Sequence, residues 1–233
     1  MEILTNIQKP FSNLSFKEEE HKYFVEGQPL DTSVSGKISN YYEKFNAEAK
    51  AKEWETKRGI PAEVTLAEWK AINDESKERG NRVHNFGERY QFDRRLIPSC
   101  PQELAITKFW NEVPEHIISV AAEFRMYHFR HLFAGTADVI LFDTKTQTYI
   151  IADYKTNKDL YKNFMGKRML PPFGDILDSP FGHYELQLSY YQILLEQLGV
   201  TVSRRIVVWL GMDGTYQNLD TRDLTERIKA TLN

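Results

Sequence analysis

Hydrophobic and polar positions divide the chain into a helical first half and a strand-rich second half. Before the helices, Phe16 and Tyr23–Val25 flank an acidic turn, which predicts a small peripheral hairpin. From 34 to 95, apolar side chains recur every three or four residues, as they do on one face of a helix. The expected boundaries are breaks at Pro61 and Thr65, a helix from Asn73–Asp74 to Tyr90, and a helix from Pro98–Pro101 to about Pro114.

From Ile117 onward, apolar and β-branched runs predict strands. Ile117–Tyr127 is followed by Gly135–Phe142 and Tyr149–Lys155, which a turn-forming stretch joins into a hairpin. The segment 163–183 is rich in proline and glycine yet carries many apolar side chains, which indicates an irregular, functional loop. The last expected elements are a helix from Tyr184 to Leu198 closed by Gly199, a strand from Arg204 to Leu210 and a helix over about 221–232.

This order of elements predicts one α/β domain over residues 1–233. Residues 1–115 form its hairpin and mainly helical part, and 116–233 form its core. Apolar residues make up 41% and charged residues 27%, and no apolar run is long enough for a membrane span, so no membrane partner is expected. Cys100 is the only cysteine, which excludes an intramolecular disulfide and a cysteine-held iron–sulfur cluster. No Walker A loop is present, so no ATP is expected, and Met1–Asn6 lacks a signal pattern, which favours a cytoplasmic protein.

Three charged residues of the predicted hairpin are suited to metal chemistry. Side chains alternate along a strand, so Asp153 and Lys155 project to one face while Tyr154 points away, and pairing around the turn brings Asp138 close to Asp153. Two carboxylates on one face repel each other, and a divalent cation relieves that repulsion. Oxygen ligands favour Mg²⁺ or Mn²⁺. The alternative is an exposed ion pair between Asp153 and Lys155, worth about 0.2 to 1 kcal/mol.

A basic strip follows the hairpin, although the net charge of the chain is −3. Contact with nucleic-acid phosphates and an ordinary solvated loop are both compatible with such a strip. Its position directly after Lys155 favours phosphate contact, and nearby aromatic side chains, among them Phe173, can stack on bases regardless of sequence. The residues expected to contact DNA in this segment are Lys158, Tyr161, Lys162, Phe164, Lys167 and Arg168.

The hairpin motifs resemble a known enzyme family. Gly135–Asp138 followed by Ile151–Thr156 is similar to the core signature of the PD-(D/E)xK nucleases, in particular their RecB-like exonuclease branch. Upstream, Gly80–His84 resembles the Gly-x-x-x-His motif of that branch, and downstream, Gln187–Tyr191 resembles its Gln-x-x-x-Tyr motif. The likeness spans about His84 to Tyr191, and weaker similarity to phage-type and mitochondrial genome maintenance exonucleases extends into the N-terminal helices.

The resemblance implies a mixed, curved sheet flanked by helices, and a deoxyribonuclease acting in replication, recombination or repair. It implies metal ligation by His84, Asp138, Asp153 and the Tyr154 carbonyl, and a catalytic set of Asp138, Asp153, Lys155, Glu123, Gln187 and Tyr191, the last two also contacting DNA. The expected partner is DNA that is single-stranded or has free ends, in a bacterial or phage-infected cell, whereas the oligomeric state is left open. The iron–sulfur members of the branch use four cysteines, which this chain lacks.

Several local patterns also have plainer explanations. His84 and Glu88 lie one helical turn apart and can form a surface pair, or Glu88 can support the imidazole. Gln187 and Tyr191 have the spacing of core positions, and Glu123 is compatible with a surface position. Two other functions stay open: a structure-specific or restriction-like endonuclease with the same metal site, and a non-catalytic DNA-binding module.

Overall fold

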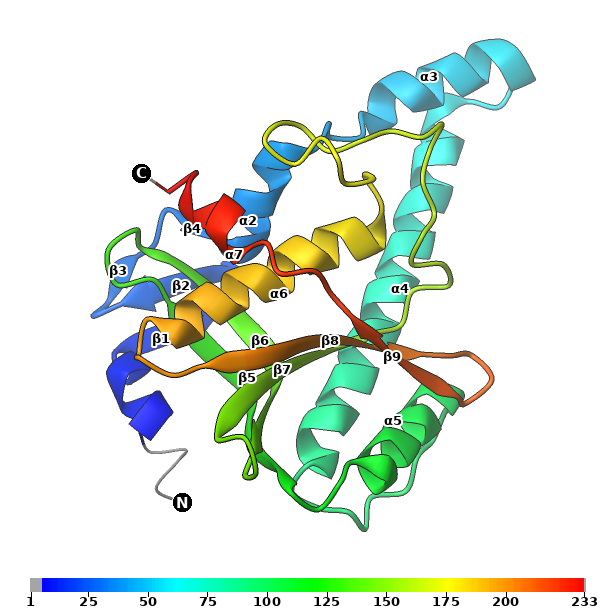
Figure 1. The fold of residues 1–233 in the computed structure, drawn as a ribbon. Coiled ribbons are helices and arrows are strands. Elements are labelled where there is room, and N and C mark those ends of the chain that lie inside the picture. The colour runs from blue at the N-terminus through cyan, green and yellow to red at the C-terminus, as the bar shows by residue number, and fades with distance from the viewer. Residues whose placement is uncertain (1–5, 233) are drawn as a thin grey trace.

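A six-stranded mixed sheet lies between two helical layers in the computed structural model, which describes residues 6–232 (Figure 1). Four strands continue in the order β6, β7, β8 and β9, and both β4 and β5 pair with β6. β7 and β8 are parallel, as are β4 and β6, and the other pairs are antiparallel. The strands are β4 (Thr32–Ser33), β5 (Ile117–Tyr127), β6 (Phe133–Asp143), β7 (Thr148–Lys155), β8 (Val202–Leu210) and β9 (Tyr216–Asp220).

The predicted α/β class and the central hairpin are confirmed. β6 and β7 pair from Asp143↔Thr148 to Val139↔Ala152, and the ladder then stops. β5 pairs with one edge of β6 along most of its length. On the other edge, β4 takes the place of β7 and pairs with Phe133 and Ala134. β6 and β7 therefore separate along Gly135–Asp138, and we call this separation the fork.

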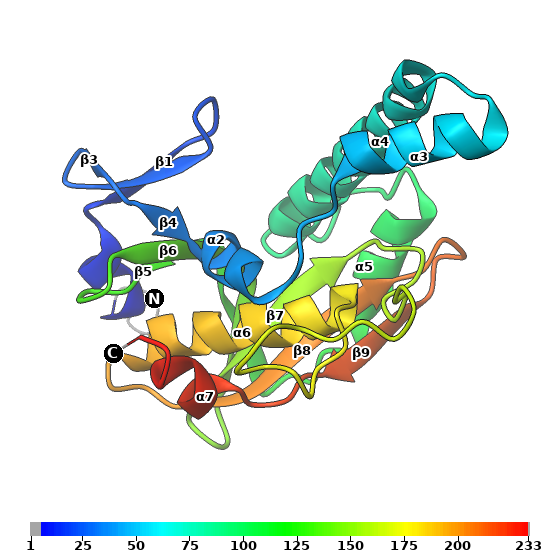
Figure 2. The same ribbon diagram turned by 90° about the horizontal axis from the view of Figure 1, so that it is seen from above.

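The two faces of the sheet carry different helices (Figure 2). Helix α6 (Pro180–Glu196) packs on one face against side chains such as Ile140 and Ile151. Helices α4 (Ala62–Tyr90) and α5 (Pro101–Glu112) pack on the other face against Val139 and Tyr154. Successive strand residues alternate between these cores, so the sheet is buried on both faces.

Helix α4 runs without interruption for 29 residues. The expected break at Pro61 is correct, since Pro61 is the N-cap, but the breaks at Thr65 and Asn73–Asp74 are wrong. Thr65 is buried, and Asp74 pairs with Lys70 one turn earlier, which stabilises the continuing helix.

Two structures project from the same side of the molecule (Figure 2). One is the three-stranded hairpin sheet of β1 (Leu14–Lys17), β2 (Lys22–Val25) and β3 (Gln28–Pro29), which confirms the predicted hairpin. The other is an arm in which α3 (Ala47–Arg58) packs on the first half of α4, with the rings of Trp54 and Trp69 5.2 Å apart. Two short helical turns, α2 (Val34–Ile38) and η2 (Ser39–Tyr41), lie between these parts along the chain, and a third, η1 (Lys9–Phe11), precedes β1.

Other boundaries differ from the sequence expectations in detail. α6 begins at Pro180, four residues early, because Ser179 caps its first turn by accepting from the Gly182 amide. Strand β9 was not expected, and the last helix, α7 (Thr225–Lys229), is shorter than expected. The segment Met1–Thr5, for which no signal was expected, lies outside the described residues. Among residues 6–232, no helix has the length and apolar character to cross a membrane.

Gly87 sets how closely α4 approaches the sheet. A Cβ atom at this position would lie 2.6 Å from the Tyr154 ring and 3.2 Å from Ile106. We expect Gly87→Ala to lower the free energy of unfolding by about 1 to 3 kcal/mol through overpacking. Gly80→Ala, seven residues earlier on the same helix, would meet only Thr156 at 3.9 Å and should instead stabilise by up to about 1 kcal/mol. Urea denaturation of both variants tests this, and equal stability would contradict the close contact.

Candidate active site

The fork between β6 and β7 places two carboxylates side by side inside the protein. Asp138 would stand opposite Asp153 if the ladder continued, but at this point the Tyr154 amide donates to Asp138 Oδ2 at 2.8 Å. Both aspartates are buried, and Asp153 is only 1% exposed. The predicted proximity of Asp138 and Asp153 is thus met by a fork rather than by a regular pair.

Lys155 lies on the same face as Asp153, as expected. Its ammonium forms an ion pair with Asp153 Oδ2 and lies 4.4 Å from the ring centre of Tyr184 on α6. Burial disfavours the charged ammonium, but Asp153 outweighs this effect and raises the pKa of Lys155. Lys155 is therefore a fixed cation at neutral pH and not a base.

His84 reaches Asp138 from the opposite helical layer. Its Nδ1 lies 3.2 Å from Asp138 Oδ2, and its ring meets the Tyr154 ring edge to face. The close approach at Gly87, three residues later on α4, positions this turn of the helix. Burial opposes protonation of the imidazole, yet the Asp138 carboxylate raises the pKa of His84 to about 9.

Glu123 enters the group through an irregularity of β5. Its φ is +45°, a left-handed value that costs a residue with a side chain about 1 to 3 kcal/mol. The pairing of β5 with β6 accordingly passes over it, from Ala122↔Val139 to Phe124↔Ala137. Burial, and then the Asp138 charge, raise the pKa of Glu123 to about 7.

Three side chains converge closely enough to hold one cation. One ligand atom each from His84, Glu123 and Asp138 lie within 4.8 Å of one another. Asp153 stands beside this group and not in it. Burial and Asp138 raise its pKa to about 6, and its Oδ2 makes the ion pair with Lys155 but has no hydrogen bond of good geometry. Crowded carboxylates with raised pKa values and a buried, unsatisfied oxygen are the surroundings that a divalent cation stabilises, so the residues present fit such an ion.

The remaining predicted site residues lie around the fork. Gln187 and Tyr191 share a face of α6, and the Gln187 amide donates to the Tyr191 hydroxyl at 2.8 Å. The Tyr191 ring lies directly on Gly135, where a Cβ would approach it to 2.6 Å. The Tyr154 side chain points into the other core and accepts from Trp110, as expected for a residue facing away from Asp153. Glu88 is exposed, and its charge adds to the raised pKa of Glu123.

A groove of about 1020 Å³ leads to the fork between α4 and the segment after β7. His84, Lys155 and Tyr184 form its inner end. Its basic walls include Lys158 and Lys162, which were predicted, and Lys77 and Arg79, which were not. Arg79 has a buried Nε without a hydrogen-bond partner. The sequence signal for Lys77 and Arg79 is their position one to two turns before His84 on the same helix.

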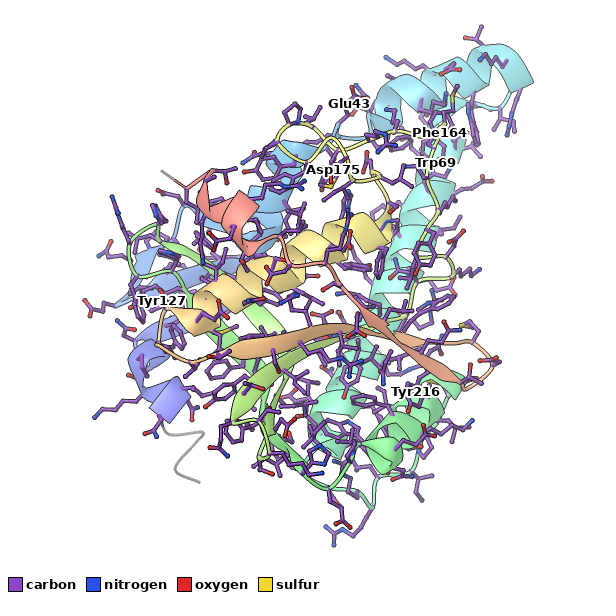
Figure 3. The ribbon with its side chains drawn as sticks, in the orientation of Figure 1. Glu43, Trp69, Tyr127, Phe164, Asp175 and Tyr216 are labelled. Atoms are coloured by element: carbon purple, nitrogen blue, oxygen red, sulfur yellow. The ribbon has the colours of Figure 1, made fainter. Side chains whose placement is uncertain are left out.

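The other residues predicted to contact DNA fall into two groups, one exposed to solvent and one bonded within the protein. Tyr161 and Phe164 are 56% and 64% exposed. Lys167 pairs with Glu43 at 2.7 Å, and Arg168 donates to the Asp175 carbonyl, so both are engaged within the protein. In Figure 3, Phe164 and Glu43 are labelled near the arm end of the molecule.

Phe173 was expected to be available for base stacking, and that expectation is wrong. It is fully buried, with its ring 4.7 Å from that of Tyr41. The loop packs this ring on Tyr41 of η2, where the Leu170 amide also donates to the Tyr41 carbonyl. Aromatic residues in an irregular segment can thus serve as core.

Comparison with models of known protein families and with curated protein sequences found no match.

Glu123 provides a test of carboxylate crowding. Its folded-state pKa of about 7 lies above the ordinary 4.5, so the folded protein binds this proton more tightly and loses stability as pH rises from about 4.5 to about 7. In EDTA at pH 8, Glu123→Gln should therefore raise the free energy of unfolding by about 1 to 3 kcal/mol, and by less at pH 5. With saturating Mn²⁺ at pH 8 the order should reverse, because the cation stabilises only a complete site.

Exposed Glu115→Gln is the matched control and should change neither result. Chemical denaturation at both pH values, with EDTA or Mn²⁺, measures the four states. Equal stabilities of wild type and Glu123→Gln in all of them would contradict the proposed crowding.

Proposed function

We propose that this protein is a Mg²⁺- or Mn²⁺-dependent deoxyribonuclease that hydrolyses phosphodiester bonds at DNA ends. One observation carries the proposal: a partly buried group of His84, Glu123 and Asp138 lies beside the Asp153–Lys155 pair at the inner end of a basic groove. That group would hold a divalent cation, which would supply positive charge to a phosphate and acidify a water molecule. The motif resemblance to RecB-like nucleases supports the same function.

The protein groups have distinct parts in this proposal. His84, Glu123 and Asp138 would hold the cation, and Asp153 extends the acidic site while it orients Lys155. Lys155 stays protonated and stabilises negative charge that develops on the phosphate. Tyr191 and Gln187 border the fork on the α6 side, where a substrate strand passes.

The reaction consumes one water molecule for each bond. The water oxygen joins phosphorus, the bond from phosphorus to one sugar oxygen breaks, and the proton that the water gives up ends on the departing sugar oxygen. Asp153, with its pKa raised to about 6, is mostly ionised at neutral pH and accepts a proton more readily than an ordinary aspartate.

The preference for DNA ends rests on the resemblance to exonucleases. An endonuclease would use the same metal site, so the substrate must distinguish the two. End-labelled linear DNA, single- and double-stranded, should be degraded with Mg²⁺ or Mn²⁺, while circular single-stranded DNA should survive. Cleavage of the circle would establish the endonuclease alternative, and binding without cleavage of either form would favour the non-catalytic module.

Substitution at the Asp153–Lys155 pair should abolish cleavage. Asp153→Asn and Lys155→Gln keep a polar side chain of similar size, so the charge that remains still has a hydrogen-bonding neighbour. Each should lower the cleavage rate at least about 100-fold, because Lys155→Gln removes the preorganised charge that stabilises the phosphate and Asp153→Asn removes the group that accepts a proton and orients Lys155. DNA binding should change little.

Exposed Lys145→Ala, in the turn of the same hairpin, is the control and should cleave normally. Single-turnover cleavage and thermal melting are measured on the same preparations. Undiminished metal-dependent cleavage by a folded Asp153→Asn or Lys155→Gln protein would refute the proposed site.

The groove should make DNA binding depend on salt. Each lysine–phosphate contact on a single strand contributes about 0.7 to the slope of log affinity against log salt. Lys158→Ala/Lys162→Ala should therefore reduce that slope by about 1.4. Lys145→Ala/Arg130→Ala, which removes two exposed charges outside the groove, should leave it unchanged.

Fluorescence anisotropy with labelled single-stranded DNA at several salt concentrations measures both slopes. Lys167→Ala/Arg168→Ala should have the smaller effect, because these side chains already have partners within the protein. Identical slopes for all three double variants would reject the groove as the DNA path.

A further inference from the structure

A second, smaller cavity lies beside the fork and has a different chemistry. We call it the flap pocket. Its volume is about 230 Å³, and it lies between the β1–β2 hairpin, the start of α2, β6 and α6. Its lining residues are Phe16, His21, Tyr23, Ser33, Val34, Ser35, Ala134, Gly135, Gln187 and Tyr191. None of them lines the basic groove.

The flap pocket adjoins the catalytic fork through two tyrosines. The Tyr23 hydroxyl is 2.9 Å from the Thr136 hydroxyl, and Thr136 precedes Asp138 by two residues on the same face of β6. The Tyr191 ring covers Gly135, which is three residues, or about 10 Å, from Asp138 along the strand. That length is comparable to the reach of one nucleotide from its phosphate to the far edge of its base.

The lining suits a nucleobase and not a phosphate. It contains no lysine, arginine, aspartate or glutamate, in contrast to the groove. Phe16 and Tyr23 lie with ring centres 4.6 Å apart and ring planes tilted by 48°, so a base can stack on one ring and meet the other at an angle. Gln187 donates one N–H to Tyr191, so its carbonyl oxygen and second N–H can face a base edge, and the exposed Ser35 hydroxyl adds another polar group.

The size of the flap pocket limits what it can hold. A volume of about 230 Å³ is the room of about seven or eight water molecules at about 30 Å³ each, and a nucleobase has about eight to eleven heavy atoms. The flap pocket is therefore of the size of one base.

We infer that the flap pocket receives the terminal base of the DNA strand, so that the enzyme releases single nucleotides. The strand then lies along the basic groove, the scissile phosphate sits at the fork, and the last base stacks against Phe16 and Tyr23. This inference rests on the proposed function.

Two variants change the flap pocket in opposite directions. Phe16→Ala enlarges it and should raise the fraction of dinucleotide and longer products at least fivefold. Ser35→Tyr fills it and should slow removal of terminal nucleotides at least tenfold. Ser15→Tyr adds the same side chain at an exposed position of β1 whose neighbour Phe16 points the other way, and should behave as wild type. Mass spectrometry of products from a uniformly labelled 20-mer measures all four proteins, and melting curves verify that each is folded.

A binding measurement separates this inference from the nuclease activity. In the cleavage-deficient Asp153→Asn protein, 2-aminopurine at the DNA terminus should lose fluorescence by stacking, while 2-aminopurine in mid-strand should not. The loss should disappear with Phe16→Ala and Ser35→Tyr and persist with Ser15→Tyr. If terminal quenching is absent, or if active wild type releases mainly longer products, the flap-pocket inference is overturned while the nuclease stands. If wild type never cleaves yet the terminal base is quenched, the proposed function fails and the pocket remains a base-binding site.

Discussion

Everything at the site depends on the separation of β6 from β7 beyond Val139 and Ala152. In a continuous ladder, Asp138 and Asp153 would be opposed carboxylates within a closed sheet. The fork instead lets the Tyr154 amide, which a ladder would have used, bind Asp138, and it admits His84 from one layer and Lys155 from the other face. Burial without cationic neighbours would cost several kcal/mol for each carboxylate. The positive charges of His84 and Lys155 offset that cost, since His84 pairs with Asp138 and Lys155 pairs with Asp153.

The positive and negative charges at the fork do not cancel, and the excess negative charge lies on one side. The pKa of Asp138 is lowered by His84, whereas those of Asp153 and Glu123 are raised by burial and by Asp138. Negative charge is thus in excess on the side of the fork that faces Glu123, while Lys155 and the groove supply positive charge on the other. Glu123 takes a left-handed backbone conformation to reach this position. Strain and charge repulsion concentrated at one point are typical of sites whose stability is completed by a ligand.

The sequence predicts the parts of this arrangement that follow from strand periodicity. Alternation and a short turn were enough to bring Asp138 near Asp153, to put Lys155 on the same face, and to turn Tyr154 away.

Tertiary packing decided the rest. Glu123 points inward because β5 is irregular there, which no local pattern encodes. α4 continues through Asn73–Asp74 because a weak local preference is outweighed by the helix on either side. Phe173 is core because η2 lies over it, a contact between segments more than 130 residues apart. The close approach at Gly87 is likewise visible only once the Tyr154 ring is in place.

The parallel pairing of β4 with β6 brings together Thr32 and Phe133, which are far apart in the sequence. The fork is also covered by α6, which ends at Glu196. A contact of such long sequence separation is gained only after a large loop of the chain has closed, and this closure costs conformational entropy. A ribosome-bound chain that has not yet emerged as far as Tyr191 has the acidic residues but not the α6 wall that covers Gly135. The charged cluster therefore acquires its final geometry only after α6 has been synthesised, and a chain truncated before α6 lacks one wall of the fork.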